Sequence, residues 1–310
     1  MKEQEKNNLK RLLWLGNVHS FFPDRSAMDL QQGYNEWLYH KQAFQKLYAE
    51  MDLARLKEMV DRVPRVDLEA GIMLTFHYGP YRLVPRYLLA MGYKVTLLVS
   101  ADVLLREETD YCRELNIMGL SKDYFECLDA QNPMVLRKLC QAVKAKRMVV
   151  VFLDAHESLA NNADKDREGK LRIAFGAHYF YWRTNMLKLA QRLGISVSVT
   201  HMEVRKQGDQ QSWQMRIPQI VLSTRDKNRQ DALLKAFEVL QQTFQAMIAG
   251  DWTAWENWTL LHRYTVVKKQ NRSASINSTG SWLMPFTLGH KAYLFDIATR
   301  GFFEVVCKNK

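Results

Sequence analysis

Apolar and polar positions alternate in blocks along the chain, and from residue 70 onward these blocks predict strands that alternate with helices. Short, almost uninterrupted apolar runs at 72–76 and 148–153 are typical of strands that are covered on both faces. The alternation predicts an α/β fold with a mainly parallel central sheet flanked by helices. The strands expected are 72–76, 94–100, 148–153, 195–204 and 213–217, and the helices expected are 83–91, 103–115, 133–146, 184–193 and 226–249.

The first 69 residues are expected to add N-terminal helices to this domain. Leu9, Leu12 and Leu13 form one apolar helical face, which we expect to be short because Gly16 stands at its next position. This face could pack on the protein's own core or lie in a membrane interface. Residues 36–60 continue the helical pattern, with these expected core positions: Trp37, Phe44, Leu47, Tyr48, Met51 and Leu56.

The composition changes near the C-terminus and divides the chain. Residues 1–266 are predicted to form the α/β domain, and residues 267–281 read as a polar linker or loop rich in Ser and Asn. Residues 282–310 form a C-terminal extension that is too small to be a domain and could be a hairpin or a lid. A second polar loop is expected at 155–170.

The bulk composition is that of a globular protein, with 47% hydrophobic and 25% charged residues. No apolar run reaches the length of a membrane span, and the N-terminus does not resemble a signal peptide. The four cysteines lie far apart, without a CxxC pair, so zinc and redox motifs are not supported and reduced cytosolic thiols are expected.

The chain is basic, with 44 Lys and Arg against 33 Asp and Glu and a net charge of +11. Such a charge suits an anionic partner, such as an acidic carrier protein, an anionic membrane surface or nucleic acid. No Lys/Arg block and no zinc-finger, RRM or KH pattern is present, so nucleic acid is not expected.

His77 is the first candidate for chemistry, because it follows directly after the apolar run 72–76 and precedes a Gly79-Pro80 turn. Ligands of open α/β sheets bind beyond the carboxyl ends of the strands. A histidine at this place can accept a proton near neutral pH, or it can simply hold the turn by a hydrogen bond.

Four sequence blocks, in the order and spacing found here, resemble the lysophospholipid acyltransferase superfamily, and its bacterial lipid A (late) acyltransferases in particular. The blocks are LTFHYGPYR, VVVFLDAHES, RIAFGAHYFYWRTNMLKLAQRLGISVSV and WTAWENWTLLHRY, and together they span about residues 70–264. The resemblance implies a transferase of lipid biosynthesis that acts at the cytoplasmic membrane face. It also implies an acyl donor that is a thioester of acyl carrier protein or coenzyme A.

One position departs from the family pattern, in which an acidic residue five positions after the histidine orients the imidazole. Here that position is Arg82, which cannot accept a hydrogen bond from an imidazole N–H. Three interpretations remain open. Another carboxylate serves His77, with Asp154 as first candidate and Glu157 as second; or the acceptor is an amine, which needs less activation; or the site is degenerate and the protein binds without catalysis.

Further residues are candidates for binding. Arg172 and Arg183 flank the Phe175-Gly176 turn, where related glycerol-phosphate acyltransferases hold a phosphate, and Arg82 itself could bind an oxyanion or a carboxylate. Backbone N–H groups near Gly79 could stabilise an oxyanion. Asp154, His156 and Glu157 lack a further ligand for a metal site. The aromatic residues expected in the core, or along an acyl tunnel, are Tyr181, Trp182, Trp252, Trp255 and Trp258.

The sequence hypothesis is thus a cytoplasmic enzyme, peripheral on the membrane, that moves a fatty acyl group to a hydroxyl or amine of a lipid or specialised metabolite. His77 is its general base and Asp154 its partner. No cofactor is expected beyond the acyl-carrier or acyl-CoA donor, and acidic acyl carrier protein is the expected partner. The alternatives are a catalytically silent homologue that binds a lipid or carrier protein, and a hydrolase that uses the same histidine on water.

Overall fold

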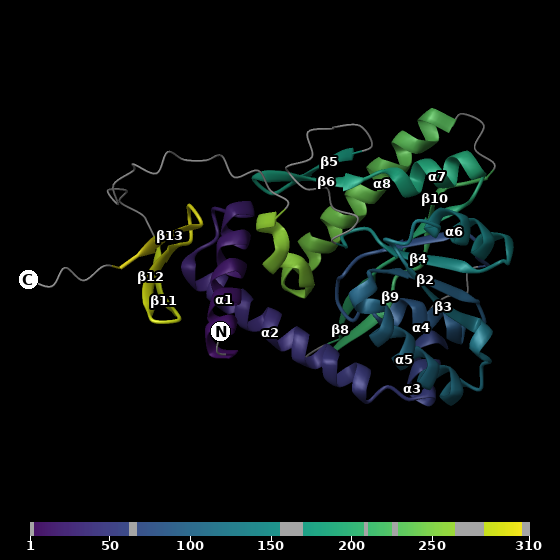
Figure 1. The fold of residues 1–310 in the computed structure, drawn as a ribbon, viewed down its shortest axis with the longest axis horizontal. Helices are drawn as coiled ribbons and strands as arrows, with labels where there is room; N and C mark the ends of the chain where they lie inside the picture. The colour runs from purple at the N-terminus through teal and green to yellow at the C-terminus, as the bar shows by residue number, and fades with distance from the viewer. Residues whose placement is uncertain are drawn as a thin grey trace, which may run out of the picture.

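A six-stranded sheet forms the centre of the computed structural model, which describes residues 3–61, 67–155, 170–207, 210–224, 229–263 and 282–305 (Figure 1). The strand order is β10-β7-β1-β4-β2-β3, in which β10 is antiparallel to β7 and the other neighbours are parallel. The predicted fold class, a mainly parallel sheet flanked by helices, is confirmed. The strands are β1 (Ile72–Thr75), β2 (Val95–Val99), β3 (Phe125–Asp129), β4 (Met148–Phe152), β7 (Val197–Val199) and β10 (Gln219–Leu222).

Alternate side chains of β1 enter two different cores, as the twofold repeat of a strand requires. Ile72 and Leu74 belong to the larger core, which also takes side chains from α6, α7 and α8. Met73 belongs to a second core with side chains from α4 and α5. Both faces of the central strands are therefore covered, which explains their continuous apolar sequences. The helices are α4 (Leu83–Ala90), α5 (Ala101–Met118), α6 (Val135–Lys144), α7 (Asn185–Leu193) and α8 (Arg229–Gly250).

Three helices precede the sheet: α1 (Glu3–Phe21), α2 (Ala27–Ala49) and α3 (Leu53–Asp61). The prediction that the apolar face of α1 ends at Gly16 is wrong, because the helix continues for five more residues after Gly16. Gly16 is explained by close packing instead, since a Cβ there would lie 3.0 Å from the Phe295 ring. The helix packs on the protein's own core through residues such as Leu12 and Leu15. No helix in the described ranges is both long and apolar enough to cross a membrane.

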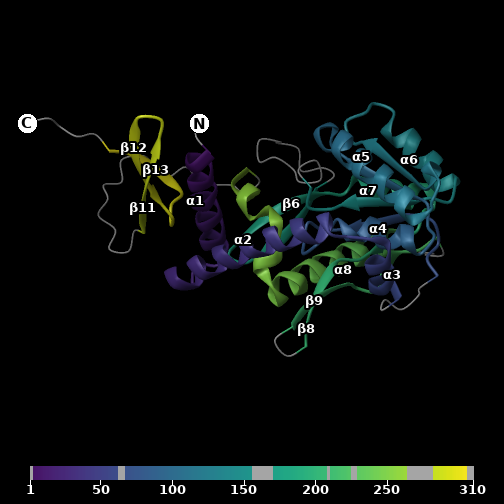
Figure 2. The ribbon, with the colours of Figure 1, turned by 90° about the horizontal axis from the view of Figure 1, so that it is seen from below.

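The C-terminal extension forms a separate antiparallel sheet beside α1 (Figures 1 and 2). Its strands are β11 (Leu283–Leu288), β12 (Lys291–Asp296) and β13 (Gly301–Glu304), one strand more than a hairpin. Phe286, Phe295 and Ile297 are buried in the same core as α1. The extension therefore packs against the N-terminal helix. The expected linker at 267–281 lies outside the described residues.

Several strands differ from the sequence expectation. Within the central sheet, β3 and β10 were not predicted. The strand expected at 195–204 is two strands, β7 and β8 (Met202–Gln207). At the break, the Thr200 hydroxyl donates to the Arg216 carbonyl at 2.6 Å. β8 then pairs with β9 (Gln210–Met215) in a hairpin that projects from the body (Figure 2).

His201 stands at this break, where only 4% of the residue is exposed. Burial, and then the charge of Arg216, lower the pKa of His201 from 6.5 to about 4. The folded state therefore binds fewer protons than the unfolded state between these pH values, so its stability falls as the pH drops from 6.5 toward 4. We expect a loss of about 3 kcal/mol over this range.

Urea unfolding at several pH values, with the variant His201→Gln beside the wild type, measures this contribution. The variant should lose the part of the pH dependence that comes from the histidine. Equal slopes for the two proteins between pH 6.5 and 4 would contradict the assignment.

Candidate active site

The ends of two adjacent parallel strands bring His77 and Asp154 together. β1 pairs with β4 so that Thr75 lies opposite Phe152, and the pairing continues where the Leu153 N–H donates to the Thr75 carbonyl at 2.8 Å. Each strand then ends, two residues before its functional side chain. His77 Nδ1 lies 2.9 Å from Asp154 Oδ1. The expectation that Asp154 reaches His77 is thus confirmed as a contact.

Asp154 is almost completely buried and receives several hydrogen bonds. The backbone N–H of His77 lies 3.0 Å from each carboxylate oxygen, and the Trp255 indole N–H donates to Oδ2 at 2.6 Å. The Asn257 amide donates to the Asp154 carbonyl at 2.9 Å and lies 3.3 Å from Oδ2. A buried carboxylate needs such donors in place of water. They also fix the carboxylate so that Oδ1 faces the imidazole.

The imidazole of His77 is held on its sides by aromatic rings. Its centroid lies 4.7 Å from that of Tyr81 and 4.5 Å from that of Phe152, and about a fifth of the side chain is exposed. Because a carboxylate accepts, Nδ1 carries the proton of the neutral ring, and Nε2 is then the basic nitrogen. The arrangement is that of a general base with an orienting carboxylate.

The segment 251–257 is hydrogen-bonded to the turn that carries His77. Gly79 N–H donates to the Ala254 carbonyl at 3.0 Å, and Glu256 N–H donates to the His77 carbonyl at 2.9 Å. The Gly79 amide is therefore used within the protein, so the expectation that it binds an oxyanion is wrong. Gly79 has a positive φ of 60°, and a Cβ there would lie 2.5 Å from the Trp213 ring, so only glycine fits.

A cavity of about 270 Å³ lies next to this site. One wall comes from α2, the second from the turn after β1 and the third from residues 253–256. Tyr81 connects the cavity to the His77–Asp154 pair, because its ring lines the cavity and also packs against His77. The α2 wall consists of Trp37, His40, Lys41, Phe44, Gln45 and Tyr48.

Several groups of the cavity are held by hydrogen bonds or ion pairs. Burial, together with the Glu256 carboxylate that accepts from its hydroxyl, raises the pKa of Tyr81 well above 10, so Tyr81 stays a phenol. His40 Nε2 lies 3.2 Å from Asp251. Burial opposes ionisation of Asp251, but the hydrogen bonds from His40 and Thr253 outweigh it and lower the pKa of this carboxyl.

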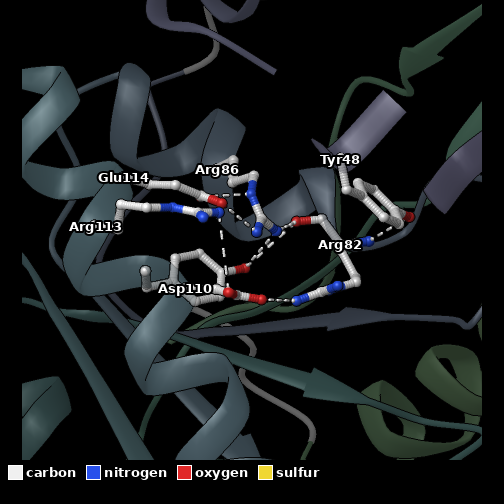
Figure 3. A network of polar contacts seen from close by, with 7 residues as sticks. Tyr48, Arg82, Arg86, Asp110, Arg113 and Glu114 are labelled. Carbon is white, nitrogen blue, oxygen red and sulfur yellow. Dashed lines mark hydrogen bonds and ion pairs between the residues drawn. The ribbon is translucent and has the colours of Figure 1, made fainter. Parts of the chain in front are cut away.

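Arg82, at the position where the resembled family has an acid, lines the cavity and contacts residues of α2 and α5 (Figure 3). Its guanidinium donates to Asp110 at 2.9 Å and lies over the Tyr48 ring at 5.2 Å. Next to it, Arg86 forms a bidentate pair with Glu114 at 2.6 and 2.7 Å and donates to the Arg82 carbonyl at 2.5 Å. Arg82 thus pairs with a carboxylate of the protein itself, and its binding of a substrate oxyanion or carboxylate stays a prediction.

The predicted residues around the Phe175-Gly176 turn do not line this cavity. They lie on a hairpin of β5 (Lys170–Phe175) and β6 (His178–Arg183), where Arg172 and Arg183 are exposed and Arg172 stacks over Tyr179 at 3.9 Å. Phe175 is buried against Trp255, with 6.0 Å between the centroids. These four residues therefore lie away from the cavity, and their role in substrate binding stays a prediction. Phe175 also packs against the tryptophan that donates to Asp154.

Gly176 is fixed by a close approach of two backbones. Its φ is 53°, and a Cβ there would lie 2.1 Å from the Phe21 carbonyl oxygen. We expect Gly176→Ala to lower the free energy of unfolding by about 2 kcal/mol or more. Gly194→Ala is the matched control, because Gly194 has a φ of 64° but nothing within 4 Å of a Cβ. Urea unfolding that gives equal losses for the two variants would contradict this role of the contact.

Other candidates have different outcomes. His156 and Glu157 lie outside the described residues, as does most of the loop expected at 155–170. Among the described residues, no group of three or more His, Cys, Asp or Glu is placed to hold a metal ion. Trp255, Trp258 and Trp182 are buried in the larger core, as expected.

Sequence reasoning missed the donors to Asp154 and the α2 wall. Trp255 was predicted to lie in the core or along an acyl tunnel, not to donate to Asp154, and Asn257 was not singled out. A helical stripe was a usable signal for the wall, because Trp37, Lys41, Phe44 and Tyr48 follow one another at intervals of three or four residues.

No protein-family model matches the chain, and no curated protein matches it.

Proposed function

We propose that this protein is an acyltransferase, which moves an acyl group from a thioester to a hydroxyl or amine. The observation that carries the proposal is the short contact between His77 Nδ1 and the buried Asp154 carboxylate, at the carboxyl ends of two central strands. A histidine ordered in this way is suited to take a proton from an attacking group. The four sequence blocks that resemble the acyltransferase superfamily point to the same chemistry.

In the proposed step, His77 Nε2 takes the proton of the acceptor O–H or N–H while the acceptor atom attacks the thioester carbonyl carbon. A bond from oxygen or nitrogen to carbon forms, and the carbonyl becomes a tetrahedral oxyanion. When this intermediate collapses, the C–S bond breaks and the thiolate takes the proton back from the imidazolium. Asp154 stabilises the imidazolium between these events and keeps the ring in one orientation.

We propose that Asp154 takes the role of the acidic residue that is replaced by Arg82 in the motif. The family's acid follows the histidine in the same turn, whereas here the carboxylate comes from the next strand of the sheet. The positive charge of Arg82 is neutralised by Asp110, so Arg82 does not compete with His77 for the Asp154 carboxylate. This favours the interpretation in which a second carboxylate serves His77 over the interpretation in which a lone histidine acts on an amine.

The donor is proposed to be a thioester of acyl carrier protein or coenzyme A. Acyl carrier protein is acidic, and a chain with a net charge of +11 attracts it by long-range electrostatics. The same charge would hold the enzyme on an anionic membrane from the cytoplasmic side. The acceptor is placed in the class of lipids or specialised metabolites that carry a hydroxyl or an amine.

Intact mass spectrometry of loaded acyl carrier protein tests the proposal. The protein is mixed with carriers of several acyl lengths and with a pool of lipid and metabolite acceptors. Acyl transfer predicts an unloaded carrier together with an acylated acceptor. Free fatty acid formed without an acceptor would indicate a hydrolase, and a carrier that stays loaded would indicate a protein that binds without catalysis, as the replacement of the motif acid by Arg82 suggests.

A further inference from the structure

Two lysines from different helices meet over one tryptophan at the rim of the cavity. Lys10 of α1 has its Nζ 5.8 Å from the Trp37 ring centroid, and Lys41 of α2 has its Nζ 5.5 Å from the same centroid. Trp37 is itself fixed, because it is buried and its indole N–H donates to the Trp255 carbonyl at 3.1 Å. The face of an indole attracts cations, so the ring holds both ammonium groups at one place.

The positive charge at this place exceeds the negative charge beside it. Glu256 lies 3.9 Å from Lys41 Nζ, at the limit of an ion pair, and its carboxylate also accepts from Tyr81. Burial lowers the pKa of Lys10, and the neighbouring Lys41 ammonium lowers it further. Two cations therefore share one partly exposed carboxylate, and an added anion would reduce their repulsion.

The other cationic groups that line the cavity have their own carboxylates. Arg82 is paired with Asp110 at 2.9 Å, and His40 lies 3.2 Å from Asp251. The excess charge is thus concentrated at Lys10 of α1 and Lys41 of the α2 wall, and Tyr81, which also lines the cavity, packs against His77.

We infer that Lys10 and Lys41 bind the phosphate group of a ligand whose remaining part enters the cavity. A phosphate ester carries up to two negative charges at neutral pH and offers several acceptor oxygens, which suits two ammonium donors side by side. As a substrate subsite this inference rests on the proposed acyl transfer, because the phosphate would belong either to the pantetheine arm of the donor or to the acceptor. As a binding site it can be measured without turnover.

Calorimetric titration compares three pairs of probes: inorganic phosphate against chloride, pantetheine 4′-phosphate against pantetheine, and glycerol 3-phosphate against glycerol. We expect saturable binding of the phosphorylated member of a pair and much weaker binding of the other. Tighter binding of pantetheine 4′-phosphate than of inorganic phosphate places the site on the donor arm. Tighter binding of glycerol 3-phosphate places it on the acceptor.

Variants connect the binding to the two lysines. Lys10→Gln and Lys41→Gln should each weaken phosphate binding about tenfold, and the double variant about a hundredfold. Lys46→Gln is the matched control, because Lys46 lies on the same helix, is exposed and pairs with Glu50 at 3.7 Å. Glu256→Gln should change affinity in the opposite direction, since it removes the carboxylate that competes with the ligand.

The outcomes separate this inference from the proposed function. His77→Gln should bind phosphate like the wild type, so binding that depends on Lys10 and Lys41 stands even where no acyl transfer is found. Equal affinity of wild type and the double lysine variant, each with an unchanged circular dichroism spectrum, would overturn the inference, and so would equal binding of phosphorylated and unphosphorylated probes. Failure of the phosphate-binding inference would leave the proposed acyl transfer standing, because transfer is measured in a separate experiment.

Discussion

Replacement of His77 by glutamine is expected to lower the rate of acyl transfer by about 100- to 10,000-fold. Glutamine is close in size and can still donate to Asp154, but it has no nitrogen that accepts a proton near neutral pH. The imidazole is partly exposed and its ring contacts are with Tyr81 and Phe152, so the fold should be kept. The measurement is the initial rate of thioester consumption with acceptor present, together with the circular dichroism spectrum.

His290→Gln provides the matched control, because His290 is an exposed histidine in the turn between β11 and β12. It undergoes the same chemical change and should keep the wild-type rate. A rate for His77→Gln within a factor of three of the wild type would contradict the role of the imidazole.

Replacement of Asp154 by asparagine is expected to give the second large effect, with a fall in kcat of about 100- to 10,000-fold and little change in KM. The amide removes the negative charge that stabilises the imidazolium. The new NH₂ group is a donor and would face a group that is itself a donor. These groups are the His77 backbone N–H, the Trp255 indole and the Asn257 amide. The unpaired buried donors should lower the free energy of unfolding by about 1–3 kcal/mol.

Asp123→Asn serves as the control for this variant, because Asp123 is an exposed aspartate that pairs with Lys94. It should keep both the rate and most of the stability. A wild-type kcat in Asp154→Asn would show that the carboxylate has only a structural task. A loss confined to KM would show that it acts on substrate binding.

The sequence was sufficient to predict the inner strands of the central sheet, since continuous apolar runs such as 72–76 have few alternatives to a buried parallel strand, but not its edge strands β3 and β10. It was also sufficient to predict that Asp154 lies near His77. Both residues directly follow such runs, and neighbouring parallel strands end at the same edge. Arg82 was recognised as a departure, but its partner Asp110 lies 28 residues further on and has no pattern that links the two.

The groups that hold the His77–Asp154 pair could not be predicted, because they depend on contacts between distant segments. Trp255 and Asn257 are more than 100 residues from Asp154 in the chain. Their side chains reach it only after η2 and η3, the short 3₁₀ helices Trp252–Ala254 and Glu256–Arg263, have packed against the turn that follows β1. Gly16 was misread for a similar reason. Local propensity favours a helix end at glycine, but the Phe295 ring on the C-terminal sheet explains why a glycine is needed there.

The central claim, that His77 and Asp154 act as one unit in acyl transfer, is tested most directly by a double-mutant cycle. The rate of appearance of acylated acceptor is measured for the wild type, His77→Gln, Asp154→Asn and the double variant. The account predicts transfer by the wild type and a double variant no slower than His77→Gln alone, because the carboxylate works only through the imidazole. Effects that multiply independently, or no acylated acceptor with the wild type, would contradict it.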